Sequence, residues 1–145
     1  MDKDRNSDPG VAGAMDVNPD IFVPDEENLE ASKRGVVFEL PKSGMTDLDF
    51  DMFTDGDKAK SIEIDVRPVA MAYEEFYCGF TADSHPAFSC TPISGKMERR
   101  NGPPTTVTVT CEPRGQRGEL KAWLCFILPD EKMFSTFYQI TCQAR

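Results

Sequence analysis

The chain has 145 residues, with 25 acidic and 16 basic side chains and a formal net charge of −9. This length suits one domain of ordinary size with some additional chain. The acidic balance argues against binding to nucleic-acid phosphates, and no apolar run approaches the roughly 18 residues of a membrane-spanning helix. The composition therefore predicts a soluble globular domain.

The first part of the chain carries most of the negative charge. Residues 1–60 contain 15 acidic and 7 basic side chains, whereas residues 61–145 contain 10 and 9. Residues 1–34 show neither helical nor strand periodicity. They predict a disordered or extended acidic N-terminal arm, followed by one domain over residues 35–145.

One short motif stands out within this arm. Ile21, Phe22 and Val23 form an apolar trio between two prolines, and three acidic residues follow. We interpret the trio as a docking peptide for a protein partner. A strap across the domain and an ordinary linker are the alternatives.

The rest of the chain predicts an antiparallel β-sandwich. Apolar and polar residues alternate over residues 36–40, 62–66 and 107–111, and a proline follows each run. This alternation is typical of half-buried strands that end in turns. Residues 120–128 carry apolar side chains on both faces, which indicates a strand covered on both sides or one at an interface. A last strand is expected over residues 134–142, and shorter strands over residues 69–73, 76–80 and 87–91.

An acidic stretch over residues 47–57 raises the possibility of calcium binding. Asp47, Asp49 and Asp51 have the spacing of the first three ligands of an EF-hand loop. Met52 and Lys58 occupy the positions where that loop requires Gly and Glu. A metal site at the three aspartates is therefore only an alternative interpretation, and no cofactor is expected.

Apolar residues are interleaved with these carboxylates. Phe50 and Phe53 are the aromatic members, and we predict that they contact a protein partner. The alternation fits an edge strand with one apolar face, or an acidic-hydrophobic segment that docks on a basic partner.

Segments of the C-terminal half follow a recognisable order. They are Phe88-Ser-Cys-Thr-Pro92, Ser94-Gly95-Lys96-Met97, the run from Thr106 to Pro113, and the run from Gly118 to Leu124. This order resembles the immunoglobulin-like domains of the major-sperm-protein and abnormal-spindle/hydin (ASH) families, over residues 85–145. The resemblance implies an immunoglobulin-like β-sandwich that serves as a non-enzymatic docking module in cytoskeletal, ciliary or membrane-contact assemblies. Cys111 stands where these families usually have an aromatic residue, and the acidic insert 43–60 is atypical of them.

Basic and aromatic residues add further candidate contacts. Arg99 and Arg100 precede a turn, and a basic patch there would steer association with a partner. A second basic loop lies at residues 114–117, at the same end of the sandwich or at the opposite one. Trp123 is the only tryptophan, and we predict either a core position or an interface anchor for it.

The cysteines indicate in which cellular compartment the protein works. There are five cysteines, without a CxxC pair, among apolar or β-branched residues: Cys78, Cys90, Cys111, Cys125 and Cys142. They predict reduced, buried thiols in a reducing intracellular compartment, the cytoplasm, with a disulfide or a thiolate metal site as alternatives. Residues 1–14 lack the apolar segment of a secretory signal, and an organelle such as a plastid is the alternative if a targeting peptide was removed.

His85 lies in a turn sequence beside Ser84 and Asp83, and neighbours in sequence cannot supply the geometry of a catalytic triad.

The chain therefore offers no catalytic set, and we do not expect an enzyme. We expect a non-enzymatic protein–protein interaction domain that acts as an accessory or scaffold subunit of a larger assembly. The alternative is a β-sandwich that binds calcium or a small ligand through residues 47–57.

Overall fold

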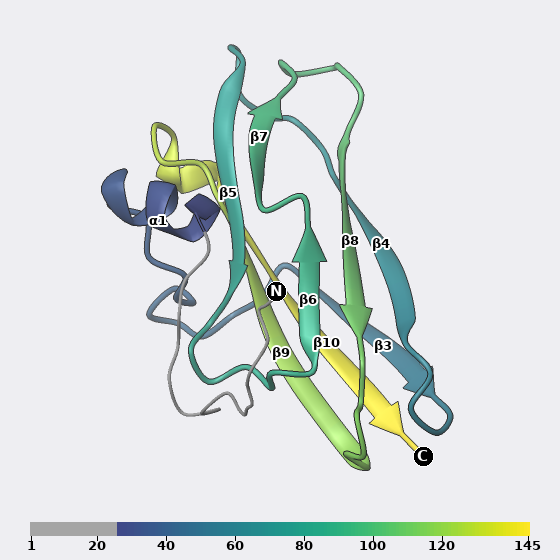
Figure 1. The fold of residues 1–145 in the computed structure, drawn as a ribbon. Coiled ribbons are helices and arrows are strands. Elements are labelled where there is room, and N and C mark those ends of the chain that lie inside the picture. The colour runs from purple at the N-terminus through teal and green to yellow at the C-terminus, as the bar shows by residue number, and fades with distance from the viewer. Residues whose placement is uncertain (1–25) are drawn as a thin grey trace.

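Two β-sheets pack face to face in the computed structural model, which describes residues 26–145 (Figure 1). One sheet has five strands in the order β3-β10-β9-β5-β7, and the other has three in the order β4-β8-β6. The elements are α1 (Glu26–Lys33), β3 (Leu48–Thr54), β4 (Lys60–Val66), β5 (Glu74–Phe80), β6 (Phe88–Thr91), β7 (Ser94–Met97), β8 (Thr105–Cys111), β9 (Gly118–Ile127), the 3-10 helix η1 (Lys132–Phe134) and β10 (Thr136–Ala144). Paired strands are antiparallel except β3, which runs parallel to β10. This arrangement confirms the predicted β-sandwich.

The core lies between the inner faces of the two sheets. Ile64 on β4 and Val107 on β8 face Phe126 on β9 and Ile140 on β10, and all four are at most 1% exposed. Phe76 on β5 stacks on Phe126, with 4.6 Å between the ring centroids. Because each such side chain contributes about 1.5–3 kcal/mol when removed from water, the alternating residues of these strands stabilise the sandwich.

A second apolar layer covers part of the outer face of the five-stranded sheet. Cys125 and Ile127 point outward from β9, yet they are buried beneath Ala31 of α1 and Val36. The strand with two apolar faces is therefore covered on both sides over this part, which is one of the two alternatives that its sequence indicated. Phe38 also packs on this layer. Figure 1 shows α1 lying against the face that β5 and β9 form, outside the sandwich.

Two sequence predictions about residues 26–40, which form this layer, are wrong. Residues 36–40 are not a strand, although Val36 and Phe38 are directed inward as the alternation suggested. We call residues 34–40 the strap, because they cross the face of the sheet instead of joining its edge. Residues 26–33, predicted as part of an extended or disordered arm, form α1. A helix this short gains most of its stability from packing, here chiefly through Ala31, which is 1% exposed.

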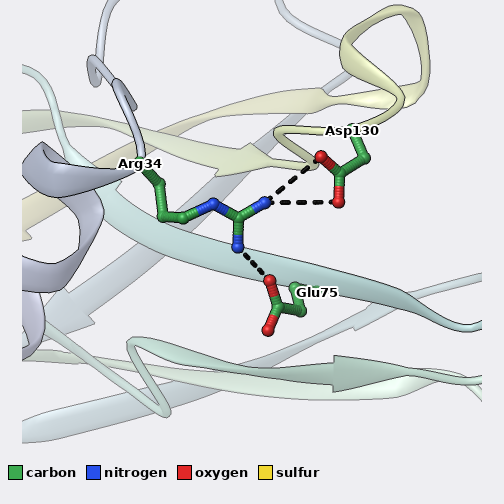
Figure 2. A network of polar contacts seen from close by, with 3 residues as sticks. All are labelled: Arg34, Glu75 and Asp130. Atoms are coloured by element: carbon green, nitrogen blue, oxygen red, sulfur yellow. Dashed lines mark hydrogen bonds and ion pairs between the residues drawn. The ribbon is translucent and has the colours of Figure 1, made fainter.

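An arginine ties the strap to the sheet. Arg34 donates to a carboxylate oxygen of Glu75 on β5, and its other terminal nitrogen lies 3.2 Å from both carboxylate oxygens of Asp130 (Figure 2). Asp130 lies in the turn between β9 and η1. One side chain of the strap therefore contacts both β5 and the turn after β9, at two residues that are 55 positions apart in the chain.

Some of the other predicted strands are present in the structure, and one is not. Strands at 76–80 and 87–91 are present as β5 and β6, whereas residues 69–73 form a loop. The apolar trio Ile21-Phe22-Val23 lies outside the described residues. No helix in the described part of the chain is long and apolar enough to cross a membrane.

Candidate functional site

Two loops meet at one end of the sandwich. Residues 67–73 connect β4 to β5, and residues 98–104 connect β7 to β8. The backbone N–H of Arg100 donates to the carbonyl of Ala70, with 2.8 Å between N and O. Both connections lie at the top of Figure 1. This hydrogen bond therefore joins two segments that are 30 residues apart in the sequence, and together they form one surface.

Local packing explains the shape of each loop. Pro68 and Ala70 are buried, so they anchor the first loop while the residues between and after them project outward. In the second loop, Asn101 has a φ of 73°, and the N–H of Gly102 donates to the carbonyl of Arg99 at 2.8 Å. A Cβ on Gly102 would lie 2.9 Å from that carbonyl oxygen, so the turn requires glycine. This turn presents the two preceding arginines to solvent.

Apolar and basic side chains gather on this surface. Val69 is 48% exposed, Met71 77% and Tyr73 50%. The guanidinium carbon of Arg99 lies 5.3 Å from the centroid of the Tyr73 ring, a cation–π contact, and Arg100 is also exposed. We call these five residues the loop-end patch. Tyrosine, methionine and arginine are enriched in protein interfaces, and exposed apolar residues in a group mark such sites.

The other basic loop lies at the opposite end of the sandwich, because strand β8 separates the two. Arg117 is paired there with Asp57 at 3.1 Å, and the N–H of Gly115 donates to the same carboxylate at 2.8 Å. These contacts, the Gly115 hydrogen bond first, lower the pKa of Asp57. Arg114 lies 3.2 Å from Glu112. By contrast, no carboxylate of residues 29–145 lies within ion-pair distance of the patch arginines.

The predicted calcium ligands lie along an extended strand. Asp49 and Asp51 project from β3, where alternate residues are about 7 Å apart, so the residues do not form an EF-hand loop. Asp47 is engaged with the backbone, since the N–H of Phe137 donates to its carboxylate at 2.7 Å. Among the described residues, no three His, Cys, Asp or Glu side chains lie together as metal ligands would. The structure thus corrects the geometry on which the calcium alternative depended.

The two phenylalanines of this strand have different surroundings. Phe50 is half-buried, packs against the core, and its ring centroid lies 6.2 Å from that of Tyr138. Phe53 is 51% exposed, and the guanidinium of Arg145 covers its ring at 5.0 Å. Within residues 26–145, β3 pairs only with β10 and lies at an edge of the sheet, as the edge-strand interpretation of this stretch expects. Phe50 therefore serves packing, and Phe53 lies on the surface.

Trp123 lies on the outer face of β9, beyond the part that the strap covers. It is half-buried, and its indole N–H donates to the side-chain oxygen of Gln139 on β10 at 3.1 Å. Phe53 is aligned with Gln143, four residues and about 13 Å further along β10. The structure therefore does not bring Phe53 or Trp123 to the loop-end patch, where Arg99 and Arg100 lie.

Sequence reasoning missed the apolar members of the patch. Val69, Met71 and Tyr73 alternate with Ala70 and Ala72, which predicts a strand with its larger side chains in the core. In the structure the small Ala70 is the buried residue of the run. A signal was present in Pro68, which favours a turn at the end of the preceding strand.

Comparisons with known proteins support the fold. No family model and no curated protein matches this chain. Among solved structures, the chain is similar to the ASH/PapD-like domain 7 of human CEP192, with 17% identity, a TM-score of 0.54, and coverage of 67% of this chain and 80% of that one. It also matches the MSP-domain protein SSP-19 of Caenorhabditis elegans, with 10% identity, a TM-score of 0.45, and coverage of 65% and 94%. The fold of this chain is thus similar to the immunoglobulin-like sandwich of an ASH/PapD-like domain, which confirms the predicted resemblance.

Proposed function

We propose that this protein is a non-enzymatic interaction domain that serves as an accessory or scaffold subunit and binds a protein partner through the loop-end patch. The observation that carries the proposal is the group formed by exposed Val69, Met71 and Tyr73 beside Arg99 and Arg100. The fold is compatible with this role, although a fold by itself does not assign a function.

The composition of the patch indicates the chemistry of the partner. Exposed Arg67 lies in the same loop as the apolar residues and carries a further positive charge. A complementary surface would carry acidic side chains around apolar ones, because opposite charges steer association while desolvated apolar anchors supply most of the affinity. We infer an acidic segment with apolar side chains as the partner's contact.

The thiols bear on where the domain works. All five cysteines are free, and four of them are buried. We propose a reducing intracellular compartment such as the cytoplasm, with a plastid or a similar organelle as the alternative, because free thiols persist where the medium is reducing.

Co-purification from the native source with matched variants tests the binding proposal. The test variant is Arg99→Glu with Arg100→Glu, and the control is Arg114→Glu at the opposite end, where the side chain is 80% exposed. We expect the same partner with the wild type and the control, and at least a roughly tenfold lower yield with the test variant, because about 1.4 kcal/mol suffices for that factor.

Two results would contradict the proposal. One is a strictly monomeric wild type without any partner under mild conditions. The other is equal recovery of the partner by both variants, which would move the contact away from the loop-end patch. Met71→Asp gives an independent check, since it places an unpaired charge in the apolar centre of the patch.

A further inference from the structure

Two pairs of free cysteines lie across the core, with one thiol of each pair on either sheet. The Cys90 thiol on β6 lies 4.0 Å from the backbone carbonyl oxygen of Cys78 on β5, and Cys111 on β8 lies close to Cys142 on β10. In each pair one cysteine belongs to the five-stranded sheet and the other to the three-stranded sheet. Cys125 lies apart from them, under the strap.

The chain crosses from the three-stranded to the five-stranded sheet at the first pair. The backbone N–H of Cys78 donates to the carbonyl of Ile93 at 2.9 Å, which continues the pairing of β5 with β7. The Cys90 sulfur, at the end of β6, lies 4.0 Å from the Cys78 carbonyl oxygen. Cα atoms of β5 and β6 come within 8 Å of each other. A disulfide needs Cα atoms about 4.4–6.8 Å apart, a separation of the same order as this approach of β5 and β6.

The two pairs differ in access to solvent. Cys90 is only half-buried, since β6 is an edge strand, whereas Cys78 is fully buried behind it. Cys111 and Cys142 are both fully buried, and the Cys142 thiol lies 3.7 Å from the hydroxyl of Thr54 inside the core. A reagent in solution can therefore reach the first pair through Cys90 but not the second.

We propose that Cys78 and Cys90 form a dithiol site that a small-molecule disulfide, such as glutathione disulfide, oxidises to a bond between the two sheets. The Cys90 thiolate attacks the external disulfide, forms a mixed disulfide and releases one glutathione thiolate. The Cys78 thiol then gives up its proton, its thiolate attacks the Cys90 sulfur, and the second glutathione leaves as a thiolate that takes up a proton. The protein loses two protons and two electrons, and one glutathione disulfide becomes two glutathione thiols.

The order of these two steps follows from the surroundings of Cys78. Its hydrogen bond with Cys90 and its burial raise the pKa of the Cys78 thiol well above the ordinary value. The thiol of Cys78 therefore stays protonated while Cys90 is free, and formation of the mixed disulfide removes the contribution of Cys90. Cys90 is the attacking residue and Cys78 the resolving one.

Oxidation of the full folded chain with glutathione disulfide, followed by acid quenching and mass spectrometry without reduction, tests the proposal. We expect a species lighter by two hydrogens, three titratable thiols, and a disulfide joining the peptides that chymotrypsin separates by cleavage after Phe80. The bond should raise Tm by several degrees, because it closes a loop in the unfolded chain.

Matched variants separate this site from other thiol chemistry. Cys90→Ser should abolish both the disulfide and any adduct, and Cys78→Ser should retain glutathione on Cys90. Cys142→Ser should oxidise like the wild type. The result that would overturn the proposal is a wild type that keeps five free thiols, holds glutathione on Cys90 without resolving it, or joins Cys111 to Cys142 instead. The wild-type map decides the matter even if Cys78→Ser fails to fold.

Discussion

At the scale of single residues, Phe38 and Gly79 show how the strap fits the sheet. A Cβ placed on Gly79 of β5 would lie 2.8 Å from the Phe38 ring, closer than real Cβ contacts. Phe38 is therefore seated directly on the backbone of the sheet. The glycine leaves room for the ring, and the ring in turn shields the second apolar layer from water.

This contact predicts how a methyl group added at Gly79 changes the stability of the protein. Gly79→Ala should lower the free energy of unfolding by about 1–3 kcal/mol, the usual cost of overpacking. Urea denaturation provides the measurement. In a Phe38→Leu background the same change should cost much less, since the smaller side chain can move aside. An equal cost in both backgrounds would show that Phe38 does not rest on Gly79.

Buried thiols predict a loss of stability at alkaline pH. Burial raises the pKa of Cys125 to about 12, and nearby Glu39 and Asp83 add to the shift. A raised folded-state pKa means that the stabilising contribution is complete below the unfolded thiol's pKa of about 8.5 and is lost as pH rises toward 12. Only the unfolded chain releases this proton in between. Stability should therefore fall by up to about 1.4 kcal/mol per pH unit for this group.

Comparison with Cys125→Ala isolates this contribution. Tm measured from pH 8 to 10.5 in steps should decline less steeply for the variant, because one proton-releasing group is missing. The remaining slope belongs in part to Cys111, whose pKa burial also raises to about 12. Parallel profiles for the two proteins would show that the thiol of Cys125 ionises as readily in the fold as outside it.

At the scale of elements, α1 and the strap form a cover held by few contacts. Arg34 connects this cover to β5 and to the turn after β9, and the N–H of Val36 donates to the carbonyl of Ala31 at 2.9 Å. Exposed ion pairs contribute little to overall stability, so their loss acts mainly on the local opening of the cover.

Amide hydrogen exchange should report this local opening. Arg34→Ala should speed exchange at Val36 several-fold and leave the strands of the core, such as β8, unchanged. The control is Lys33→Ala, because Lys33 is 73% exposed and pairs only with Glu30 of its own helix among the described residues. Unchanged exchange at Val36 in the Arg34 variant would mean that packing alone holds the strap.

The strand β3 carries carboxylates at an edge of the five-stranded sheet. Among the described residues β3 pairs only with β10, Asp49 and Asp51 project from it, and charges on edge strands oppose edge-to-edge association. Asp49→Val with Asp51→Val should therefore cause concentration-dependent association, visible by light scattering. Glu131→Val, in a turn, is the control, and a monomeric double variant would assign the protection to another feature.

At the scale of the whole molecule, charge is distributed unevenly. The net charge of −9 resides almost entirely in residues 1–60, whereas basic side chains occupy both ends of the sandwich. One end is neutralised internally through Asp57 and Arg117, and the other presents the loop-end patch to solvent. Electrostatic attraction at the loop-end patch would act on an acidic partner.

This distribution predicts how the proposed association responds to salt. Partner recovery should fall as ionic strength rises, because the screening length drops from about 10 Å at 0.1 M to about 3 Å at 1 M. Arg99→Ala with Arg100→Ala should bind more weakly and lose most of this dependence. A salt profile that these substitutions do not alter would show that other charges steer the partner.

The sequence by itself determined several of the strands and which of their faces are buried. Alternation over residues 62–66 and 107–111 predicted β4 and β8, and the two-faced pattern of residues 120–128 predicted a strand covered on both sides or one at an interface. These predictions succeed because burial of alternate side chains is a property of a short segment. The pattern can therefore be recognised from the segment alone, without knowledge of what it packs against.

Only the tertiary structure decided what covers each face and which residues meet. Val36 and Phe38 alternate like strand residues, but their partners are the face of the sheet, and Val69 to Tyr73 turn their larger side chains to solvent. The parallel pairing of β3 with β10 places Phe50 inward and Phe53 outward. Alternation reports that one side of a segment is buried. The element that buries it is distant in the chain, so it follows only from the way in which the whole chain packs.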